Sequence, residues 1–170
     1  MQVGMIGLGR MGANMADRLR RAGHHVVGMD PAVAGADVTT LADLVAALDA
    51  PDQPRVAWSM VPAGDATATT VAALADRLAP GDVVVDGGNA NFRDSMARAE
   101  ALAGRGIGFV DCGTSGGVWG RDAGYALMVG VPEDHVATVA PLLAALAPPS
   151  GFAHVGPAGA GHFAKMVHNA

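Results

Sequence analysis

Hydrophobic and polar positions follow two rhythms along the chain, short apolar runs and longer segments with apolar residues three or four positions apart. The apolar runs predict strands at residues 3–7, 25–30, 55–61, 82–86, 107–112, 125–131 and 152–155. The helical spacing predicts helices at residues 11–23, 40–48, 65–78, 91–103, 132–146 and 157–170. Such regular alternation indicates an α/β fold, a doubly wound and largely parallel sheet with helices on both faces.

The same pattern suggests how the chain is divided. No internal repeat or low-complexity linker interrupts it, and a glycine-rich loop is expected at residues 113–124. Gly156 and Pro157 form the best candidate boundary, because the pair ends the last strand and precedes the last helix. We therefore expect one domain over residues 1–156, followed at 157–170 by the start of a further helix.

Composition excludes several classes of function. The net charge is −5 and no basic patch occurs, which argues against a nucleic-acid partner. Cys112 is the single cysteine, so no intrachain disulfide can form, as suits a reducing cytoplasm. The first residues lack the features of a signal peptide, and no apolar run reaches the roughly 18 residues of a membrane helix. We expect a cytoplasmic protein with no membrane partner.

A glycine motif follows the first strand and opens the first helix. It reads Gly7, Leu8, Gly9, Arg10, Met11 and Gly12. In this context the first glycine permits a tight turn, the second lets the backbone approach a pyrophosphate, and the third allows close packing of helix on strand. The free N–H groups of the helix then face the phosphates. The motif predicts a Rossmann-type dinucleotide-binding domain, against the alternative of a glycine-rich turn without a ligand.

Asp30 ends the second predicted strand, 18 residues after Gly12. A carboxylate at this position can accept hydrogen bonds from both ribose hydroxyls of NAD, and it repels the 2′-phosphate of NADP. No arginine follows closely, which also favours NAD as the cofactor over NADP. The alternative is that Asp30 only caps the turn at Pro31.

The last predicted helix carries Lys165, the only lysine among 11 basic residues. Lys165, His168 and Asn169 lie on one helix face. Arginine keeps its proton at working pH, whereas a desolvated lysine can release it, so Lys165 is a candidate acid–base group. The alternatives are that Lys165 is a solvated surface residue, or that His162 is the acid–base group. No cluster of histidine, cysteine and aspartate has metal-ligand spacing, and we expect no metal.

Several motifs carry a family resemblance. The motif at residues 7–15, the loops at 60–64 and 86–89, and the segment 111–117 recur in order in the β-hydroxyacid dehydrogenase superfamily. Within it, residues 86–89, 115–120 and 161–169 resemble the decarboxylating 6-phosphogluconate dehydrogenase family. The chain is similar to the short, NAD-preferring form, because Asp30 and Pro31 stand where the long form has an arginine-containing turn.

The resemblance implies roles for individual residues. Lys165 is expected to be the general base, with Asn169 as a second catalytic residue. Residues expected to position the sugar-acid phosphate substrate are Asn89, Ser115, Gly116, Gly117, His168 and Asn169. Residues expected to contact the cofactor are Gly7, Leu8, Gly9, Arg10, Met11, Gly12, Asp30, Met60, Val61, Pro62 and Asn89.

The resemblance also implies an activity and a missing part. The expected reaction is oxidative decarboxylation of 6-phosphogluconate to ribulose 5-phosphate, in the pentose phosphate pathway. In this family the helix at 157–170 leads into an all-helical domain, absent from these 170 residues, that supplies the general acid and the dimer interface. The alternatives are another β-hydroxyacid dehydrogenase, in which Asn-Asn usually replaces His168 and Asn169, and a cofactor-binding module without turnover.

Overall fold

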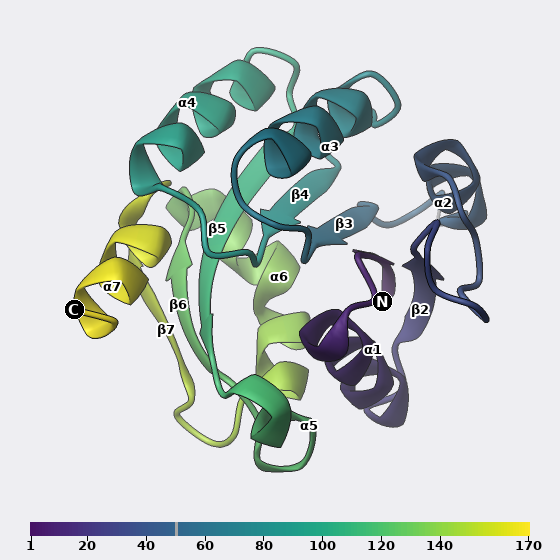
Figure 1. The fold of residues 1–170 in the computed structure, drawn as a ribbon. Coiled ribbons are helices and arrows are strands. Elements are labelled where there is room, and N and C mark those ends of the chain that lie inside the picture. The colour runs from purple at the N-terminus through teal and green to yellow at the C-terminus, as the bar shows by residue number, and fades with distance from the viewer. Residues whose placement is uncertain (50) are drawn as a thin grey trace.

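The computed structural model describes residues 1–49 and 51–170, and within them one sheet is flanked by helices (Figure 1). The strands are β1 (Gln2–Ile6), β2 (His25–Met29), β3 (Val56–Ser59), β4 (Val83–Asp86), β5 (Gly108–Ser115), β6 (Ala126–Gly130) and β7 (Phe152–Gly156). The helices are α1 (Arg10–Arg21), α2 (Leu41–Ala47), α3 (Asp65–Ala75), α4 (Phe92–Ala103), α5 (Gly120–Ala123), α6 (Glu133–Leu146) and α7 (Ala160–His168), with a 3-10 turn, η1, at Gly117–Trp119.

The sheet has the order β2-β1-β3-β4-β5-β6-β7, and every neighbouring pair is parallel except β5 and β6. This arrangement confirms the predicted Rossmann-type, largely parallel sheet. β2 and β3 lie on opposite sides of β1, so the direction of the chain connections reverses there. Ligands of open parallel sheets bind beyond the carboxyl ends of the strands at such a reversal.

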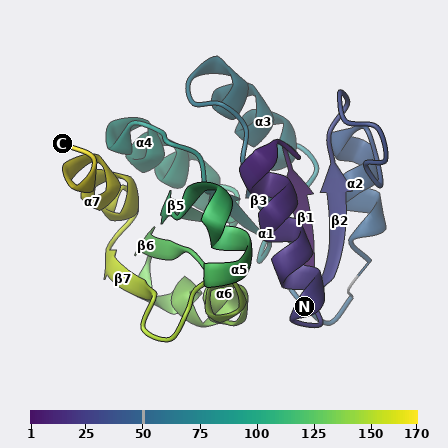
Figure 2. The same cartoon turned by 60° about the horizontal axis from the view of Figure 1, so that its bottom comes forward.

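Helices cover both faces of the sheet, as expected. Figure 2 shows α4 and α7 on one side of β5 and β6, with α6 on the other side. One core lies between the sheet and helices α1 and α6, where Met15, Leu19 and Leu143 are buried. A second core lies under α2, α3 and α4, where Leu44, Leu74 and Leu102 are buried. The two cores fix the sheet as the middle layer of the molecule.

Local signals explain several helix ends. The hydroxyl of Thr40 accepts a 3.1 Å hydrogen bond from the Asp43 N–H, which begins α2 as the capping pattern predicts. The side chain of Asn91 caps α4 in the same way. Gly23, with φ of +88°, follows the C-cap of α1 and reverses the chain toward β2.

Two expectations need correction. β5 does not stop at residue 112 but continues through Ser115, because its last residues pair with the antiparallel strand β6. The expected loop at 113–124 therefore begins later, and it also contains η1 and α5. The last helix begins at Ala160 rather than at residue 157, since Gly159 has a left-handed φ of +93°. No helix in the described part of the chain is long and apolar enough to cross a membrane.

Candidate functional site

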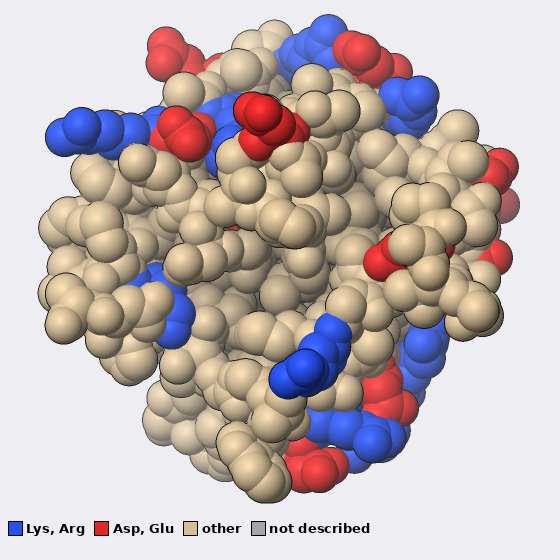
Figure 3. All heavy atoms as spheres, viewed as in Figure 1, with Lys and Arg blue, Asp and Glu red and all other residues tan. Residues whose placement is uncertain are grey.

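A cleft of about 690 Å³ opens at the carboxyl ends of the central strands. Its lining consists of Gly7, Gly9, Met11, Asp30, Met60, Val61, Pro62, Ala63, Ala66, Gly87, Gly88, Asn89, Thr114, Lys165 and Asn169. Figure 3 shows the same face as Figure 1, and its middle is hollowed and made mainly of uncharged atoms. Asp30 and Lys165 are the charged residues of the lining. The fold thus brings the two best candidates of the sequence into one cleft.

The glycine motif forms one wall of this cleft. Gly7 turns with φ of +85° and donates its N–H to the Met29 carbonyl at 2.9 Å. A Cβ atom on Gly12 would collide with the carbonyl oxygen of Gly7, so α1 can pack here only with glycine at that position. A Cβ atom on Gly9, by contrast, would meet no atom within 4 Å. Gly9 leaves open space at the start of α1.

The N-terminus of α1 is prepared for an anion. Its N-cap residue is Gly9, so no side chain caps the helix, and no acidic residue occupies the first turn. The first N–H groups of a helix have no partner within the helix, and they carry the positive end of its dipole. The open space at Gly9 and these donors fit the pyrophosphate of a dinucleotide.

Asp30 both borders the cleft and shapes its wall. Its Oδ2 atom accepts a 2.8 Å hydrogen bond from the Leu8 N–H, and its Oδ1 atom accepts one of 2.9 Å from the Ala32 N–H. The turn-capping role that the sequence left open is therefore present. Each carboxylate oxygen can accept more than one hydrogen bond, so Asp30 retains the capacity to bind ribose hydroxyls.

Lys165 stands opposite this wall, on α7. The helix lies so close to β5 that a Cβ atom on Gly113 would be 2.5 Å from the Cβ of Lys165. Lys165 is partly buried and lines the cleft together with Asn169, the C-cap residue of α7. His168 is exposed and lies outside the lining, although it shares the predicted helix face.

The loop after β4 supplies Gly87, Gly88 and Asn89 to the cleft. The buried Asp86 shapes this loop, because its Oδ1 atom accepts a 3.1 Å hydrogen bond from the Gly88 N–H. Arg98 of α4 lies 3.5 Å from the other carboxylate oxygen. The acidic residue of the motif thus holds the loop that presents Asn89.

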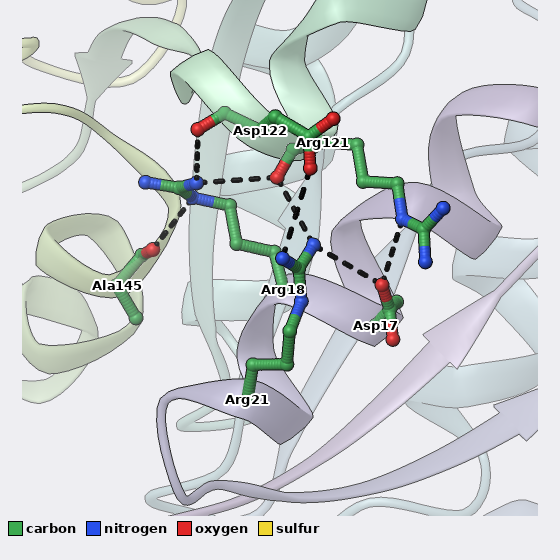
Figure 4. Close-up of polar contacts among 6 residues, drawn as sticks. All are labelled: Asp17, Arg18, Arg21, Arg121, Asp122 and Ala145. Atoms are coloured by element: carbon green, nitrogen blue, oxygen red, sulfur yellow. Dashed lines mark hydrogen bonds and ion pairs between the residues drawn. The ribbon is translucent and has the colours of Figure 1, made fainter.

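Residues 115–117 lie outside the lining of the cleft. They begin the segment 115–123, whose end, α5, is hydrogen-bonded to α1. Figure 4 shows Arg18 of α1 donating from Nε to the Ala145 carbonyl at 2.9 Å. Its Nη1 atom also donates to the carbonyls of Arg121 and Asp122 in α5, at 3.2 and 3.3 Å. Since α5 directly follows η1, these bonds hold the end of the segment against the helix that begins at the glycine motif.

The cleft gathers most of the cofactor residues expected from the sequence. The expected cofactor residues outside its lining are Leu8, Arg10 and Gly12, and the expected substrate residues outside it are Ser115, Gly116, Gly117 and His168. The sequence analysis gave no role to Thr114, although it lies within the motif at 111–117, and it did not single out Ala66; both line the cleft. Ala66 carries no local signal, because an alanine on a helix occurs throughout soluble proteins.

His162 does not compete with Lys165 for the cleft. It is 2% exposed, and its Nδ1 atom lies 2.7 Å from the hydroxyl of Ser95 in α4. A buried histidine paired with a neighbouring helix is a packing residue. Among residues 1–49 and 51–170, no group of three or more histidine, cysteine, aspartate or glutamate side chains is arranged to hold a metal ion.

Comparisons with known proteins agree with this geometry. A family model described as the NAD binding domain of 6-phosphogluconate dehydrogenase matches residues 2–156. The chain is 46% identical to the NAD(+)-dependent, decarboxylating 6-phosphogluconate dehydrogenase of Haloferax volcanii, with 99% of this chain and 58% of that protein covered. It is 36% identical to the decarboxylating 6-phosphogluconate dehydrogenase of Staphylococcus aureus, with 99% and 39% covered.

The solved structures include a related dehydrogenase. The 3-hydroxyisobutyrate dehydrogenase of Mycobacterium tuberculosis, with L-serine, superposes with a TM-score of 0.86 at 29% identity. The match covers 99% of this chain and 58% of that one. The chain therefore spans less than two thirds of the relatives that it matches.

Proposed function

The chain belongs to the family of NAD-binding domains of 6-phosphogluconate dehydrogenase, and we propose that its cleft holds NAD for the oxidative decarboxylation of 6-phosphogluconate. The observation that carries the proposal is the composition of the cleft. The uncapped start of α1 and Asp30 form one wall, and Lys165 stands in the same cavity. A cofactor site and a candidate base therefore share one space, as hydride transfer requires.

The cofactor residues divide into two groups on this proposal. The N–H groups at the start of α1 bind the pyrophosphate, and Asp30 accepts the ribose hydroxyls. Met60, Val61, Pro62 and Asn89 line the same cleft and form the second group. When bound, NAD supplies the hydride acceptor for the reaction.

Lys165 supplies the acid–base chemistry. Its neutral amine accepts the proton of the substrate C3 hydroxyl while the C3 hydride leaves. The resulting ammonium group then polarises the C3 ketone while the carboxylate leaves as carbon dioxide. The product is ribulose 5-phosphate, an intermediate of the pentose phosphate pathway.

The substrate residues surround Lys165 from three segments. Asn89 and Asn169 share its cleft, whereas His168 and residues 115–117 lie outside the lining. On this proposal they contact the parts of the sugar acid that extend beyond the cleft. On this proposal the chain is part of a longer protein, whose all-helical domain completes the phosphate site, supplies a general acid and joins two subunits. The complete enzyme is a cytoplasmic homo-oligomer on this proposal.

A second candidate is a 3-hydroxyisobutyrate-type dehydrogenase, favoured by the close superposition on the mycobacterial enzyme. The His168-Asn169 pair argues against it, since those relatives usually have two asparagines. Release of carbon dioxide together with NADH formation from 6-phosphogluconate separates the two candidates.

Cofactor binding tests the core of the proposal, by calorimetric titration of NAD into the chain. Gly9→Ala has ordinary φ and open space, so it folds normally, but its methyl group occupies the path of the pyrophosphate. We expect binding about 5- to 150-fold weaker, because overpacking a fitted contact costs about 1–3 kcal/mol. Gly104→Ala is the matched control, because φ is −60° and the nearest atom to its Cβ is 3.6 Å away. Equal affinity of the two variants contradicts the assignment.

A further inference from the structure

Apolar burial contributes little to holding the helix that carries Lys165. Gly161 and His162 are its buried residues. The large apolar side chains of α7 are about half-exposed, with Phe163, Met166 and Val167 being 48%, 50% and 58% exposed, and of these Phe163 packs edge-on against Phe92 of α4. A nine-residue helix is marginal on its own, so other contacts must fix α7 on the sheet.

Asp111 of β5 makes the first of these contacts. Its carboxylate is fully buried and accepts hydrogen bonds from the Gly159 N–H at 2.6 Å and the His162 N–H at 2.7 Å. Both donors belong to the first turn of α7 or its cap, where helical N–H groups lack partners. The carboxylate thus satisfies two orphan donors and faces the positive end of the helix dipole.

The burial of Asp111 is energetically costly, which makes its position informative. Loss of solvent raises the pKa of its carboxyl group, and the N–H groups of His162 and Gly159 oppose that rise. A buried carboxylate is destabilising unless its oxygens are paired. The two N–H groups of α7 provide that pairing, so the acid and the helix depend on each other.

Ser95 and His162 make the second contact. The Ser95 hydroxyl lies 2.7 Å from Nδ1 of His162 and connects α7 to α4. The Nε2 atom of His162 has no hydrogen-bond partner among the residues that the structure describes. Within the described chain, the contact with Ser95 is therefore the polar side-chain contact that the imidazole ring of His162 makes.

Glycines allow the helix to approach this closely. A Cβ atom on Gly130 would collide with the carboxylate of Asp111, and one on Gly161 would collide with backbone carbonyls of Asp111 and Met128. The backbone of α7 therefore touches β5 and β6 directly. Any rotation or shift of the helix changes the position of Lys165 in the cleft.

We propose that Asp111, His162 and Ser95 form a polar clamp for α7, and that Asp111 is the positioning residue for Lys165. The positioning role rests on the proposed function of Lys165, whereas the clamp itself does not. The carboxylate of Asp111 fixes the position of the first turn of α7 over the sheet and the direction of the helix axis. The Ser95–His162 contact fixes the rotation of α7 against α4. Lys165 follows one turn after His162 and is held at Gly113 by this arrangement.

Hydrogen exchange of this chain, followed by mass spectrometry, tests the clamp. Asp111→Asn keeps the shape but places an NH₂ donor against an N–H donor. We expect the amides of residues 160–168 to exchange about 10- to 100-fold faster, as for loss of a buried charge-assisted hydrogen bond. Amides of β1 and β4 keep their protection. Ser95→Ala should accelerate the same segment about fivefold. Ser59→Ala, which removes a buried hydroxyl that has no partner among the described residues, should not.

Each outcome bears on a definite part of the proposal. Unchanged exchange at 160–168 in both Asp111→Asn and Ser95→Ala overturns the clamp. If Asp111→Asn does not fold, the Ser95→Ala result alone decides, and lack of acceleration there overturns it. In the longer protein, Asp111→Asn should lower kcat with little change in KM for NAD. A looser α7 with unchanged kcat would overturn the positioning role of Asp111 and leave the clamp standing, whereas the Lys165→Arg variant tests the proposed base itself.

Discussion

The Oδ2 atom of Asp30 accepts a 2.8 Å hydrogen bond from the backbone N–H of Leu8. This bond joins the end of β2 to the middle of the glycine motif, 22 residues earlier in the chain. Asp30, which we expect to bind the ribose hydroxyls, therefore also fixes the loop that faces the pyrophosphate. Changes at Asp30 should alter cofactor choice and loop geometry together.

NAD should bind more tightly than NADP, because the Asp30 carboxylate repels a 2′-phosphate at the edge of the cleft. Asp30→Ala removes this repulsion and should narrow the difference between the two affinities. NAD affinity should also fall, since the Leu8 and Ala32 N–H groups lose their acceptor. Calorimetric titration with both dinucleotides measures each effect, and tighter binding of NADP by the unmodified chain would show the assignment to be wrong.

Lys165→Arg in the longer protein should keep a positive charge and lose nearly all turnover. Arginine does not release its proton at working pH, so it cannot act as a base. General base catalysis contributes about 10²–10⁴-fold, and a loss of that size in kcat is expected. Steady-state kinetics with 6-phosphogluconate give the result, with NAD affinity of the variant as the control for folding. A variant that retains most of the kcat would exclude Lys165 as the base.

Asp82→Asn should destabilise the fold without changing NAD affinity. Burial alone would raise the pKa of Asp82, but the Arg55 side chain and the N–H groups of Ala79 and Arg55 outweigh it and hold the pKa below its ordinary value. The ion pair of Arg55 and Asp82 lies at the amino ends of β3 and β4, away from the cleft. We expect the free energy of unfolding, measured with urea at pH 7, to fall by about 2–3 kcal/mol. The reason is that the substitution leaves the partly buried guanidinium group of Arg55 without its charged partner.

The pH dependence gives this prediction its sign. A carboxyl group with a depressed pKa in the folded state stabilises the protein above its unfolded pKa of about 3.9. That stabilisation is lost as the pH falls through the folded pKa. The stability difference between the unmodified chain and Asp82→Asn should therefore shrink below about pH 4. Asp76→Asn is the control, because its ion pair with Arg105 is exposed and should contribute at most about 1 kcal/mol.

Cys112 should be unreactive in the folded protein. It is fully buried in β5, and burial raises the pKa of its thiol to about 12, so almost no thiolate forms near neutral pH. A chromogenic disulfide reagent should label the chain only after urea unfolds it. Because Cys112 is the single cysteine, the whole signal reports on this residue. Rapid stoichiometric labelling in native buffer would contradict the buried position.

The sequence predicts the cofactor wall well because its signals are local. The glycine spacing, the strand before it and the aspartate that ends β2 lie within 30 residues and determine one another's geometry. Lys165 could be found for a different reason, since it is the one lysine in an arginine-rich set of basic residues. Both features reached the same cleft in the structure.

Long-range packing could not be read in the same way. The sequence predicts that the fifth strand ends at residue 112, because glycine and polar residues follow, and only the structure shows that these residues pair with β6. Asp111, Ser95 and His162 come from β5, α4 and α7, so no spacing connects them. Only the fold shows that an acid within a motif holds the terminal helix.

This chain alone should bind NAD and yet fail to turn over 6-phosphogluconate. The residues expected to bind NAD lie within one domain, but the chain covers 58% of the Haloferax volcanii relative. His168 and Asn169 are exposed, and Lys165 is only partly shielded from solvent. Phe163 packs edge-on against Phe92 of α4, but the side chains of Phe163, Met166 and Val167 are still about half-exposed.

Two measurements on the purified chain separate binding from turnover. Calorimetry should detect NAD, and an absorbance assay for NADH with saturating 6-phosphogluconate should show no turnover. The longer Haloferax volcanii relative serves as the positive control for the assay. Acid–base catalysis by a lysine requires water to be excluded around it, which these residues do not achieve by themselves. Turnover at roughly 1–10³ per second would show that the chain builds a complete site, and the need for a further domain would then be wrong.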